Sequence, residues 1–384
     1  MNSRERFRLA LNHREGDRIP IDLGFDVHNG IHEKAYAGLL DYLGIEDEIK
    51  IYDNVQHLAV VKEDVAKRLH SDARYVFANP SSVYEFKRES DGSWLDEWGV
   101  RRKTVGLYDE SYEFPLAGCD MASVKNFKMP DPRDKARFDG LKEQAERLYA
   151  STDYALIGGS CASLFYLSGE FVGFQEYMEK ILSDQDVIVK LVDRLLEWEC
   201  EFFDAYLAEI GEYIEMVWIG DDWGMQTGPI MNPAIFRKIF VPRYKELIKL
   251  IKSKAAVKIS LHSCGSVYWA LNDFAEMGIE VIHPLQGTAF GMDDPVKIKK
   301  EFGDRLVFYS NLCNQSILPH GTPADVDGDV KRKIEALAEG GGYILSGGHN
   351  IQADVPPANV IAMIDAALKY GRPTNVTLAD GERH

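Results

Sequence analysis

The chain has 384 residues, of which 45% are apolar and 27% are charged, as is usual for a globular protein with a substantial core. Its 44 basic and 61 acidic side chains give a formal charge of −17, which argues against nucleic acid or an anionic membrane as a partner. No apolar run approaches the roughly 20 residues that span a bilayer, and the N-terminus lacks the apolar core of a signal peptide. The five cysteines are scattered and suggest no disulfide framework. We therefore expect a cytoplasmic protein.

The first fifth of the chain mixes helices with short extended pieces. Ser3 is expected to cap a first helix that carries Phe7 and Leu11, and residues 18–24 follow as an extended segment. Apolar spacing then predicts helices at about 31–43 and about 55–69, and a strand at 73–77.

Between about residues 81 and 114 the pattern changes. Residues 83–88 and 94–100 alternate in polarity around the dipeptide Asp91-Gly92, which is typical of a β-hairpin with a tight turn. We therefore expect an antiparallel insertion here, followed by a polar helix over 131–150.

From residue 154 onward, strands and helices alternate regularly. Strands are expected at 154–157, 214–219, from 257, 280–283, 306–309 and 343–345, and helices at 174–210 with a break near 183, 233–252, 266–277, 296–302, 323–338 and 357–370. Such alternation implies parallel pairing with right-handed crossovers. About eight units predict one (β/α)8 TIM-type barrel domain over residues 1–384, with an open doubly wound sheet as the alternative. No G-x-G-x-x-G follows the first strand, so a dinucleotide site has no support.

A pair of potential metal ligands ends the strand that begins at Val257. His262 and Cys264 lie two residues apart, so on a strand they point the same way. Imidazole nitrogen and thiolate sulfur are ligands that zinc prefers, although a buried histidine beside a buried cysteine is the structural alternative. Candidates for a third ligand follow other predicted strands, and they are His349, Cys313 and Asp222.

Other polar and aromatic residues follow the predicted strands. A (β/α)8 barrel collects its functional groups at the C-terminal ends of its strands, so these residues are candidates for the same site. They are Asn79, Trp223, Gln226, His283, Asn311 and Asn350. Each has a structural alternative, because strand-end histidines are often hydrogen-bonded core residues and most tryptophans simply pack.

Several motifs together make the chain resemble the uroporphyrinogen decarboxylase superfamily along nearly its whole length. They are Ser3–Phe7, Asp17–Asp22, Asp222–Gln226, Met231–Pro233, His262–Gly265, Gly347–Gln352 and Val355–Val360. The resemblance implies a distorted (β/α)8 barrel, in agreement with the alternation of strands and helices.

Two branches of this superfamily differ in the residues they use. The decarboxylases bind a tetrapyrrole with many carboxylates through arginines in an N-terminal loop and a later aspartate. Here the corresponding loop has no arginine after Arg18 and offers Asp22 and Asp26, and residues 75–79 contain no acid. Like charges in this loop would repel a polyanionic substrate, which disfavours the decarboxylase branch. Decarboxylation of a tetrapyrrole or smaller carboxylate is therefore kept as the alternative function.

The other branch resembles corrinoid-dependent methyltransferases, which move a methyl group between a substrate or thiol and the cobalt of a partner corrinoid protein. Members with zinc use an H-x-C pair and a later cysteine. His262 and Cys264 match the pair, and His349 stands at the third position. The resemblance implies a zinc-assisted enzyme that demethylates a small substrate, such as a methoxylated aromatic or a methylamine-like compound, onto a corrinoid protein.

In this interpretation three residues are catalytic. Asp222 positions a ligand or the substrate, and Gln226 and Asn311 supply hydrogen bonds. Substrate contacts are assigned to Trp223, Asn79, His283 and Asn350. A barrel that only binds a corrinoid or tetrapyrrole is a third interpretation, and the sequence leaves a homodimer open.

Overall fold

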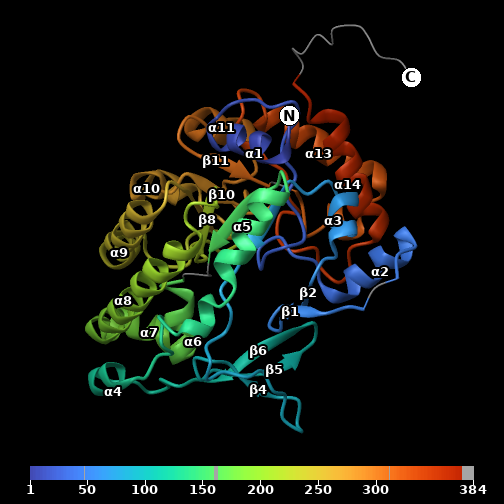
Figure 1. Ribbon diagram of the computed structural model, residues 1–384. Coiled ribbons are helices and arrows are strands. Elements are labelled where there is room, and N and C mark those ends of the chain that lie inside the picture. The colour runs from blue at the N-terminus through green and yellow to red at the C-terminus, as the bar shows by residue number, and fades with distance from the viewer. Residues whose placement is uncertain (47, 160–162, 311, 374–384) are drawn as a thin grey trace, which may run out of the picture.

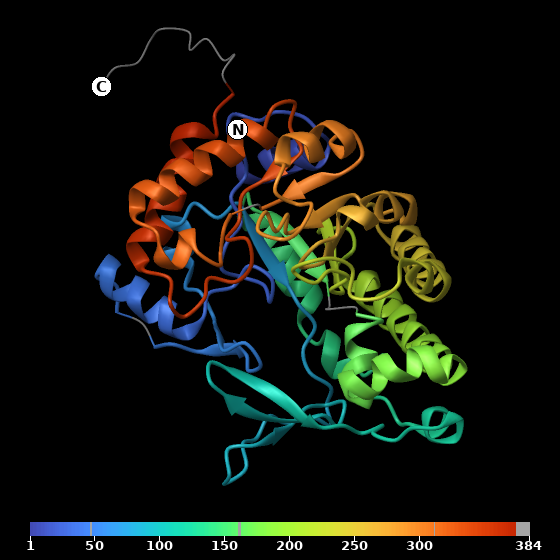
Figure 2. The same cartoon turned by 180° about the vertical axis from the view of Figure 1, so that it is seen from behind.

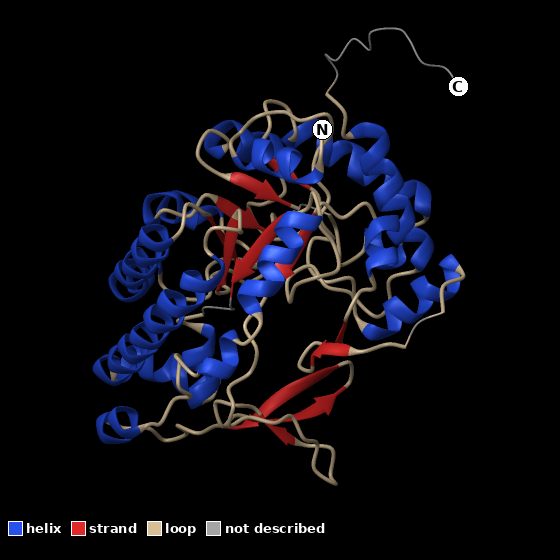
Figure 3. Cartoon of the chain, viewed as in Figure 1, coloured by secondary structure: helices blue, strands red, loops and turns tan. Residues whose placement is uncertain are grey.

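The computed structural model describes residues 1–46, 48–159, 163–310 and 312–373. Seven parallel strands form one curved sheet in the order β12-β11-β10-β9-β8-β7-β3, with helices around its outer face (Figure 1, Figure 3). The strands are β3 (Ala73–Val76), β7 (Ala155–Gly159), β8 (Met216–Gly220), β9 (Lys258–His262), β10 (Val281–His283), β11 (Val307–Tyr309) and β12 (Tyr343–Ile344).

The segment around Ile21 closes this sheet into a barrel. Ile21 forms a parallel bridge with Leu345, just after β12. The Leu345 N–H donates to the Pro20 carbonyl and the Asp22 N–H donates to the Leu345 carbonyl, both at 2.9 Å. On the other side the Asp72 N–H, just before β3, donates to the Ile21 carbonyl at 2.7 Å. The predicted (β/α)8 barrel is confirmed, and its eighth strand is this short closing segment.

Alternate strand residues point into the barrel and form a core of their own. This cluster includes Ala73, Tyr75, Ala155, Ile157, Met216, Trp218, Val281, Val307, Tyr309 and Ile344. Helix α1 (Ser3–Leu11) adds Phe7 to it and covers the N-terminal end of the barrel, where the Arg4 N–H donates to the Asp153 carbonyl just before β7. The side chain of Asn2, rather than Ser3, caps α1.

A second, larger core lies between the strands and the outer helices. The main outer helices are α5 (Leu141–Ser151), α7 (Phe174–Ser183), α8 (Gln185–Ile210), α9 (Pro233–Lys254), α10 (Leu271–Met277), α11 (Pro295–Phe302), α13 (Pro323–Leu337) and α14 (Pro357–Tyr370). Further helices are α2 (Glu33–Leu43), α4 (Met121–Asn126), α6 (Tyr166–Val172) and α12 (Ile317–His320), and 3-10 turns (Lys135–Phe138 and Tyr268–Ala270) precede α5 and α10. Within the described ranges, no helix is both long and apolar enough to cross a membrane.

The helix expected over residues 55–69 is wrong in its first half. Helix α3 covers only Glu63–Arg68. His57 has a φ of +53°, which is incompatible with a right-handed helix, and Leu58–Ala59 forms strand β2 against β1 (Ile51–Asp53). Backbone pairing with another segment therefore overrides the local helical spacing here.

The insertion is antiparallel, as expected, but its strands pair differently. Strands β4 (Trp94–Leu95), β5 (Arg101–Val105) and β6 (Tyr108–Glu113) form a separate sheet, and the β5–β6 hairpin turns at Gly106, whose φ is +69°. The expected strand over residues 83–88 is absent, because side chains such as Val83, which is 87% exposed, have no face to pack against.

This insertion lies at the end of the barrel opposite α1 in both views of the chain (Figure 1, Figure 2). Since α1 covers the N-terminal ends of the strands, the insertion lies on the side of their C-terminal ends. The Tyr108 hydroxyl donates to the Gln352 side chain, and His32 Nε2 lies 3.4 Å from the Leu107 carbonyl oxygen. The hairpin β5–β6 is thus attached to the segments that surround the open end of the barrel.

Candidate metal centre

Three potential metal ligands meet at the C-terminal end of the barrel. His262 ends β9, Cys264 follows it by two residues, and His349 lies in the loop after β12. One ligand atom from each residue lies within 4.8 Å of the other two. Cys264 Sγ and His262 Nε2 are 3.4 Å apart. The convergence arises because parallel strands of a barrel end at the same rim.

This donor set fits a zinc ion. With Zn–N near 2.1 Å and Zn–S near 2.3 Å, two ligands at the tetrahedral angle lie about 3.6 Å apart. The observed 3.4 Å between Cys264 Sγ and His262 Nε2 therefore matches two neighbouring ligands. His349 offers a nitrogen within 4.8 Å of both of these atoms, so the three donors lie close enough to be drawn onto one ion.

The other two candidates for a third ligand are not part of this group within the described residues. Asp222 Oδ1 lies 3.7 Å from His262 Nε2 and accepts a hydrogen bond from the Cys264 N–H at 2.8 Å. Cys313 Sγ instead contacts the Ser316 hydroxyl at 3.0 Å. Asp222 thus holds the backbone of the ligand loop, and Cys313 lies outside the triad.

His283 contacts the ring nitrogen of His262 that does not face Cys264. The two Nδ1 atoms are 2.8 Å apart, and both side chains are buried. One nitrogen must donate and the other accept, so His262 presents its Nε2 lone pair to a metal when its own Nδ1 carries the shared proton. Among the described residues, His283 Nε2 is buried without a hydrogen-bond partner, and the ring packs against those of Trp218 and Tyr309. The structure places His283 against His262, and its predicted substrate contact stays a prediction.

His349 has a competing local contact. Its Nδ1 accepts a hydrogen bond from the Asn350 N–H at 2.8 Å, which places the proton of the neutral ring on Nε2. Coordination through Nε2 requires that this bond open and that the proton be lost or shift to Nδ1. The preceding Gly348 has a φ of +80°, and a Cβ at that position would clash with the carbonyl of Leu312. This glycine lets the loops after β11 and β12 touch and so brings His349 to the site.

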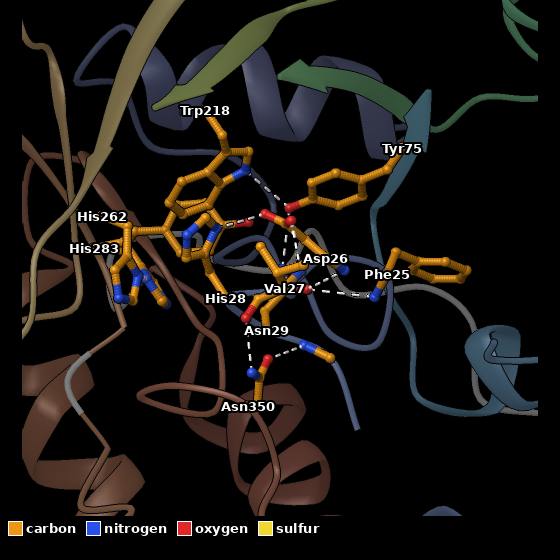
Figure 4. A network of polar contacts seen from close by, with 12 residues as sticks. Phe25, Asp26, Val27, His28, Asn29, Tyr75, Trp218, His262, His283 and Asn350 are labelled. Carbon is orange, nitrogen blue, oxygen red and sulfur yellow. Dashed lines mark hydrogen bonds and ion pairs between the residues drawn. The ribbon is translucent and has the colours of Figure 1, made fainter. Parts of the chain in front are cut away.

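Sequence reasoning missed a fourth histidine, His28. Its ring stacks on His262 at a centroid distance of 4.2 Å and on Trp218 at 5.1 Å, and its Nδ1 lies 3.0 Å from Asp26 Oδ2 (Figure 4). A Cβ at Gly220 would lie 3.3 Å from His28 Nε2, so the glycine that ends β8 leaves room for this ring. His28 follows the closing segment of the barrel as the other residues follow their strands, but the local sequence does not mark that segment as a strand.

Asn350 fixes the loop that carries His28. Its Oδ1 accepts from the Gly30 N–H, and its Nδ2 donates to the Val27 carbonyl and to Gln56 Oε1, all at 2.7 Å (Figure 4). The amide is thereby fully engaged and buried. Asn350 therefore positions this loop, and its predicted role in substrate binding stays a prediction.

Burial keeps these groups uncharged in the absence of a metal. Burial and the neighbouring histidines lower the pKa of His262 well below its usual value, and burial lowers the pKa of His349 to about 4. Burial and the Asp222 carboxyl raise the pKa of Cys264 well above its usual value. Neutral imidazoles are the form that binds metals, whereas the thiol has to lose its proton to a bound cation.

A buried carboxyl lies beneath the histidines inside the barrel. Asp22 Oδ2 accepts hydrogen bonds from the hydroxyls of Tyr75, at 2.5 Å, and Tyr309, and from Asn29 Nδ2 at 2.8 Å. Trp218 Nε1 donates to the Tyr75 hydroxyl at 3.2 Å (Figure 4). Burial raises the pKa of Asp22 to about 6 despite these donors. The floor of the site is thus a hydrogen-bonded network around one acid.

The pair Asp221-Asp222 divides its work. Asp221 is buried and accepts from the N–H groups of Phe165 and Tyr166, each at 2.7 Å, and from the Tyr244 hydroxyl, so it fastens the loop after β7. Asp222 faces the ligand loop.

Two further residues predicted to contact substrate make other contacts in the structure. The Trp223 side chain is fully buried and packs against Phe165, Phe236 and Phe240 at centroid distances of 4.6–5.0 Å. The Asn79 amide donates to the carbonyls of Ala136 and Asp139. The substrate contacts of both residues stay predictions.

The two remaining catalytic candidates are placed differently. The Gln226 side chain is exposed at the rim, where its Nε2 donates to the Thr288 carbonyl. Asn311 lies outside the described residues.

Comparisons with known proteins agree with this architecture. The model of a family described as uroporphyrinogen decarboxylase (URO-D) matches residues 113–370. The uroporphyrinogen decarboxylase of Pseudoalteromonas atlantica is 23% identical over 280 residues, which cover 69% of this chain and 74% of that protein. That of Aliivibrio salmonicida is 25% identical over 285 residues, covering 70% and 75%.

Among solved structures, a methyltransferase from Methanosarcina mazei superposes with a TM-score of 0.68 at 17% identity, over 96% of this chain and 99% of that one. At this identity the likeness shows the fold. Because the family model matches well over half of its residues, the chain belongs to the uroporphyrinogen decarboxylase family.

Proposed function

We propose that this member of the uroporphyrinogen decarboxylase family transfers a methyl group from a small methylated substrate to the corrinoid of a partner protein. The observation that carries the proposal is the set of one sulfur and two nitrogen donors, from Cys264, His262 and His349, within 4.8 Å of one another at the open end of the barrel. The Methanosarcina mazei neighbour, named a methyltransferase, supports it at the level of the fold.

A zinc ion held by these three residues would supply Lewis-acid stabilisation of the charge that develops on the atom that loses the methyl group. The chain's own residues prepare this site. His283 fixes the tautomer of His262, and Asp222 holds the Cys264 N–H. His28, stacked on His262 and hydrogen-bonded to Asp26, restricts rotation of the ligand ring. Substrates with an ether oxygen, such as methoxylated aromatics, suit this chemistry.

The second candidate is decarboxylation, favoured by the relatives named uroporphyrinogen decarboxylase at 23–25% identity. A polycarboxylate substrate needs cationic partners, and the loop after the closing segment provides Asp26 instead. Arg74, on β3, is already paired with Glu63 at 2.9 Å. Because Asp26 is acidic and Arg74 is already paired, decarboxylation of a polycarboxylate is the second candidate rather than the first.

Metal analysis of the purified protein tests the proposal. We expect one zinc per chain in the wild type and its loss in Cys264→Ser with the fold retained. Cys313→Ser is the matched control, because Cys313 lies outside the triad, and it should keep its zinc. A Cys264→Ser variant that retains zinc and full methyl transfer would refute the ligand assignment. Turnover of uroporphyrinogen by the wild type would favour the second candidate.

A further inference from the structure

Three segments in the loops after β8, β10 and β11 contain no charged side chain. No Lys, Arg, Asp or Glu occurs in residues 223–232, 284–292 or 312–322, and Asp222, which accepts from the Cys264 N–H, immediately precedes the first of them. Elsewhere the chain is highly charged, since 27% of all its residues are charged and its net charge is −17. A neutral rim on such a protein points to a neutral ligand rather than to an anion or a charged protein surface.

Three glutamines meet on this rim, and we call Gln226, Gln286 and Gln315 the glutamine rim. Gln226 Oε1 accepts from Gln286 Nε2 at 3.3 Å and from Gln315 Nε2 at 3.5 Å, and Thr288 Oγ1 donates to Gln315 Oε1 at 2.6 Å. The two amide contacts between glutamines are long, so their exchange for contacts with a ligand costs little. The cluster offers amide donors and acceptors and no charge.

The glutamine rim adjoins the ligand loop. Gln286 Oε1 accepts from the N–H of Gly265 at 2.8 Å, and Gly265 directly follows Cys264. A molecule bound along the rim therefore lies beside the metal group.

Two large apolar side chains are exposed on the same surface. Met225 is 55% exposed and Phe290 is 74% exposed. They are held together, because the Phe290 N–H donates to the Gln226 carbonyl at 2.9 Å. Exposed apolar groups that flank uncharged amides are typical of a binding surface for a ligand with apolar faces and a polar edge.

We infer that the glutamine rim, with Met225 and Phe290, binds the edge of a corrin macrocycle. The cobalt of this corrin is the atom that accepts the methyl group. The inference rests on the proposed function. A corrin carries primary amides along its edge and methyl groups on its faces, and its periphery is uncharged. Its amides can exchange donor and acceptor contacts with the glutamines, while Met225 and Phe290 pack against its apolar face.

Direct binding of methylcobalamin to the zinc-loaded full chain, measured by equilibrium dialysis in the dark, tests this inference. We expect the wild type to bind it. The double variant Gln226→Glu/Gln315→Glu loses neutral hydrogen bonds and adds charge, so its dissociation constant should rise at least about tenfold. Phe290→Ser, which removes an exposed apolar side chain, should also weaken binding. Gln144→Glu, on the outer helix α5, is the matched control and should bind as the wild type does.

Zinc content and unfolding temperature of each variant show whether it is folded. If the rim variants are folded and bind methylcobalamin as tightly as the wild type, or if the wild type does not bind it, the inference is wrong. These outcomes are distinguishable from failure of the proposed function. If the wild type transfers methyl groups from substrates to a corrinoid while the rim variants bind methylcobalamin normally, only the inference about the glutamine rim is wrong. Absence of methyl transfer to any corrinoid overturns the proposed function itself.

Discussion

Replacement of His283 by leucine is the sharpest test of how the site holds a metal. The substitution removes the acceptor for His262 Nδ1, which lies 2.8 Å away in a fully buried environment. Leucine has an apolar side chain that can pack against the rings of Trp218 and Tyr309. The change therefore removes a hydrogen-bonding partner from the ligand with little change in shape.

The expected magnitude follows from the hydrogen bond. Without its acceptor, the Nδ1 proton of His262 is buried and unpaired, which costs about 1–3 kcal/mol. The ring avoids that cost by moving the proton to Nε2, where it blocks coordination. Partners of this kind typically contribute a factor of about 10–100 to metal affinity, or about 1.4–2.7 kcal/mol. We expect the zinc dissociation constant of His283→Leu to rise by that factor.

Competition with a chelator of known zinc affinity measures this change. His320→Leu, an exposed histidine on α12, is the matched control and should bind zinc as the wild type does. Thermal unfolding of the metal-free proteins should differ little, because leucine also removes the unpaired His283 Nε2. An unchanged zinc affinity in His283→Leu would refute the role of the shared proton.

Two further variants test the framework of the site. Gly265 has a φ of +84°, and a Cβ at this position would lie 2.5 Å from the backbone of Gly224. In urea titrations, Gly265→Ala should therefore lower the free energy of unfolding by about 2 kcal/mol or more. Gly228→Ala is the control, because Gly228 has open space around it, and it should change that free energy by less than about 0.5 kcal/mol. Burial raises the pKa of Asp22 to about 6, whereas the unfolded chain has the usual value of about 3.9. Between these two values the folded state binds the proton more tightly than the unfolded state. The free energy of unfolding should therefore fall, by on the order of 2–3 kcal/mol, as the pH rises from about 4 through 6. Urea titrations across that range should show this slope in the wild type and not in Asp22→Asn, and parallel curves for the two proteins would contradict the buried, protonated acid.

The metal group was predictable because it depends on few assumptions. The strands of a barrel end at one rim, so the pair His262 and Cys264 and the three candidates for a third ligand were all expected there. None of this required side-chain detail. The sequence left the choice among His349, Cys313 and Asp222 open, and the structure groups His349 with the pair.

His28 was missed because its strand is hard to recognise. The segment before it contains Pro20, which has no N–H to donate, and it joins the barrel by a single bridge at Ile21. Local pattern cannot show that such a piece is the eighth strand. Its hydrogen bonds to Leu345 and Asp72 connect residues far apart in the chain, and only the closed barrel reveals them.

Residue type alone also does not distinguish residues that support the structure around the site from residues that contact a ligand. Trp223 and Asn350 follow strands as ligands do, yet the Trp223 side chain faces the outer core. The Asn350 amide instead bonds to Val27 and Gly30 in the loop before α2 and to Gln56. The direction in which a side chain points after a strand ends depends on loop conformation, which the period-two rule no longer governs.

Closure of the barrel and the geometry of the metal group are physically coupled. His349 supplies a ligand, and the next residue, Asn350, holds the Val27 carbonyl and the Gly30 N–H on either side of His28. The same two chain segments meet at the bridge between Ile21 and Leu345 that closes the sheet. Opening of that seam therefore moves a ligand and the ring stacked on His262 together. Metal affinity should be more sensitive to changes at this seam than to equal losses of stability in the outer helices, because the seam holds His349 and His28 whereas the outer helices carry none of the three grouped ligands.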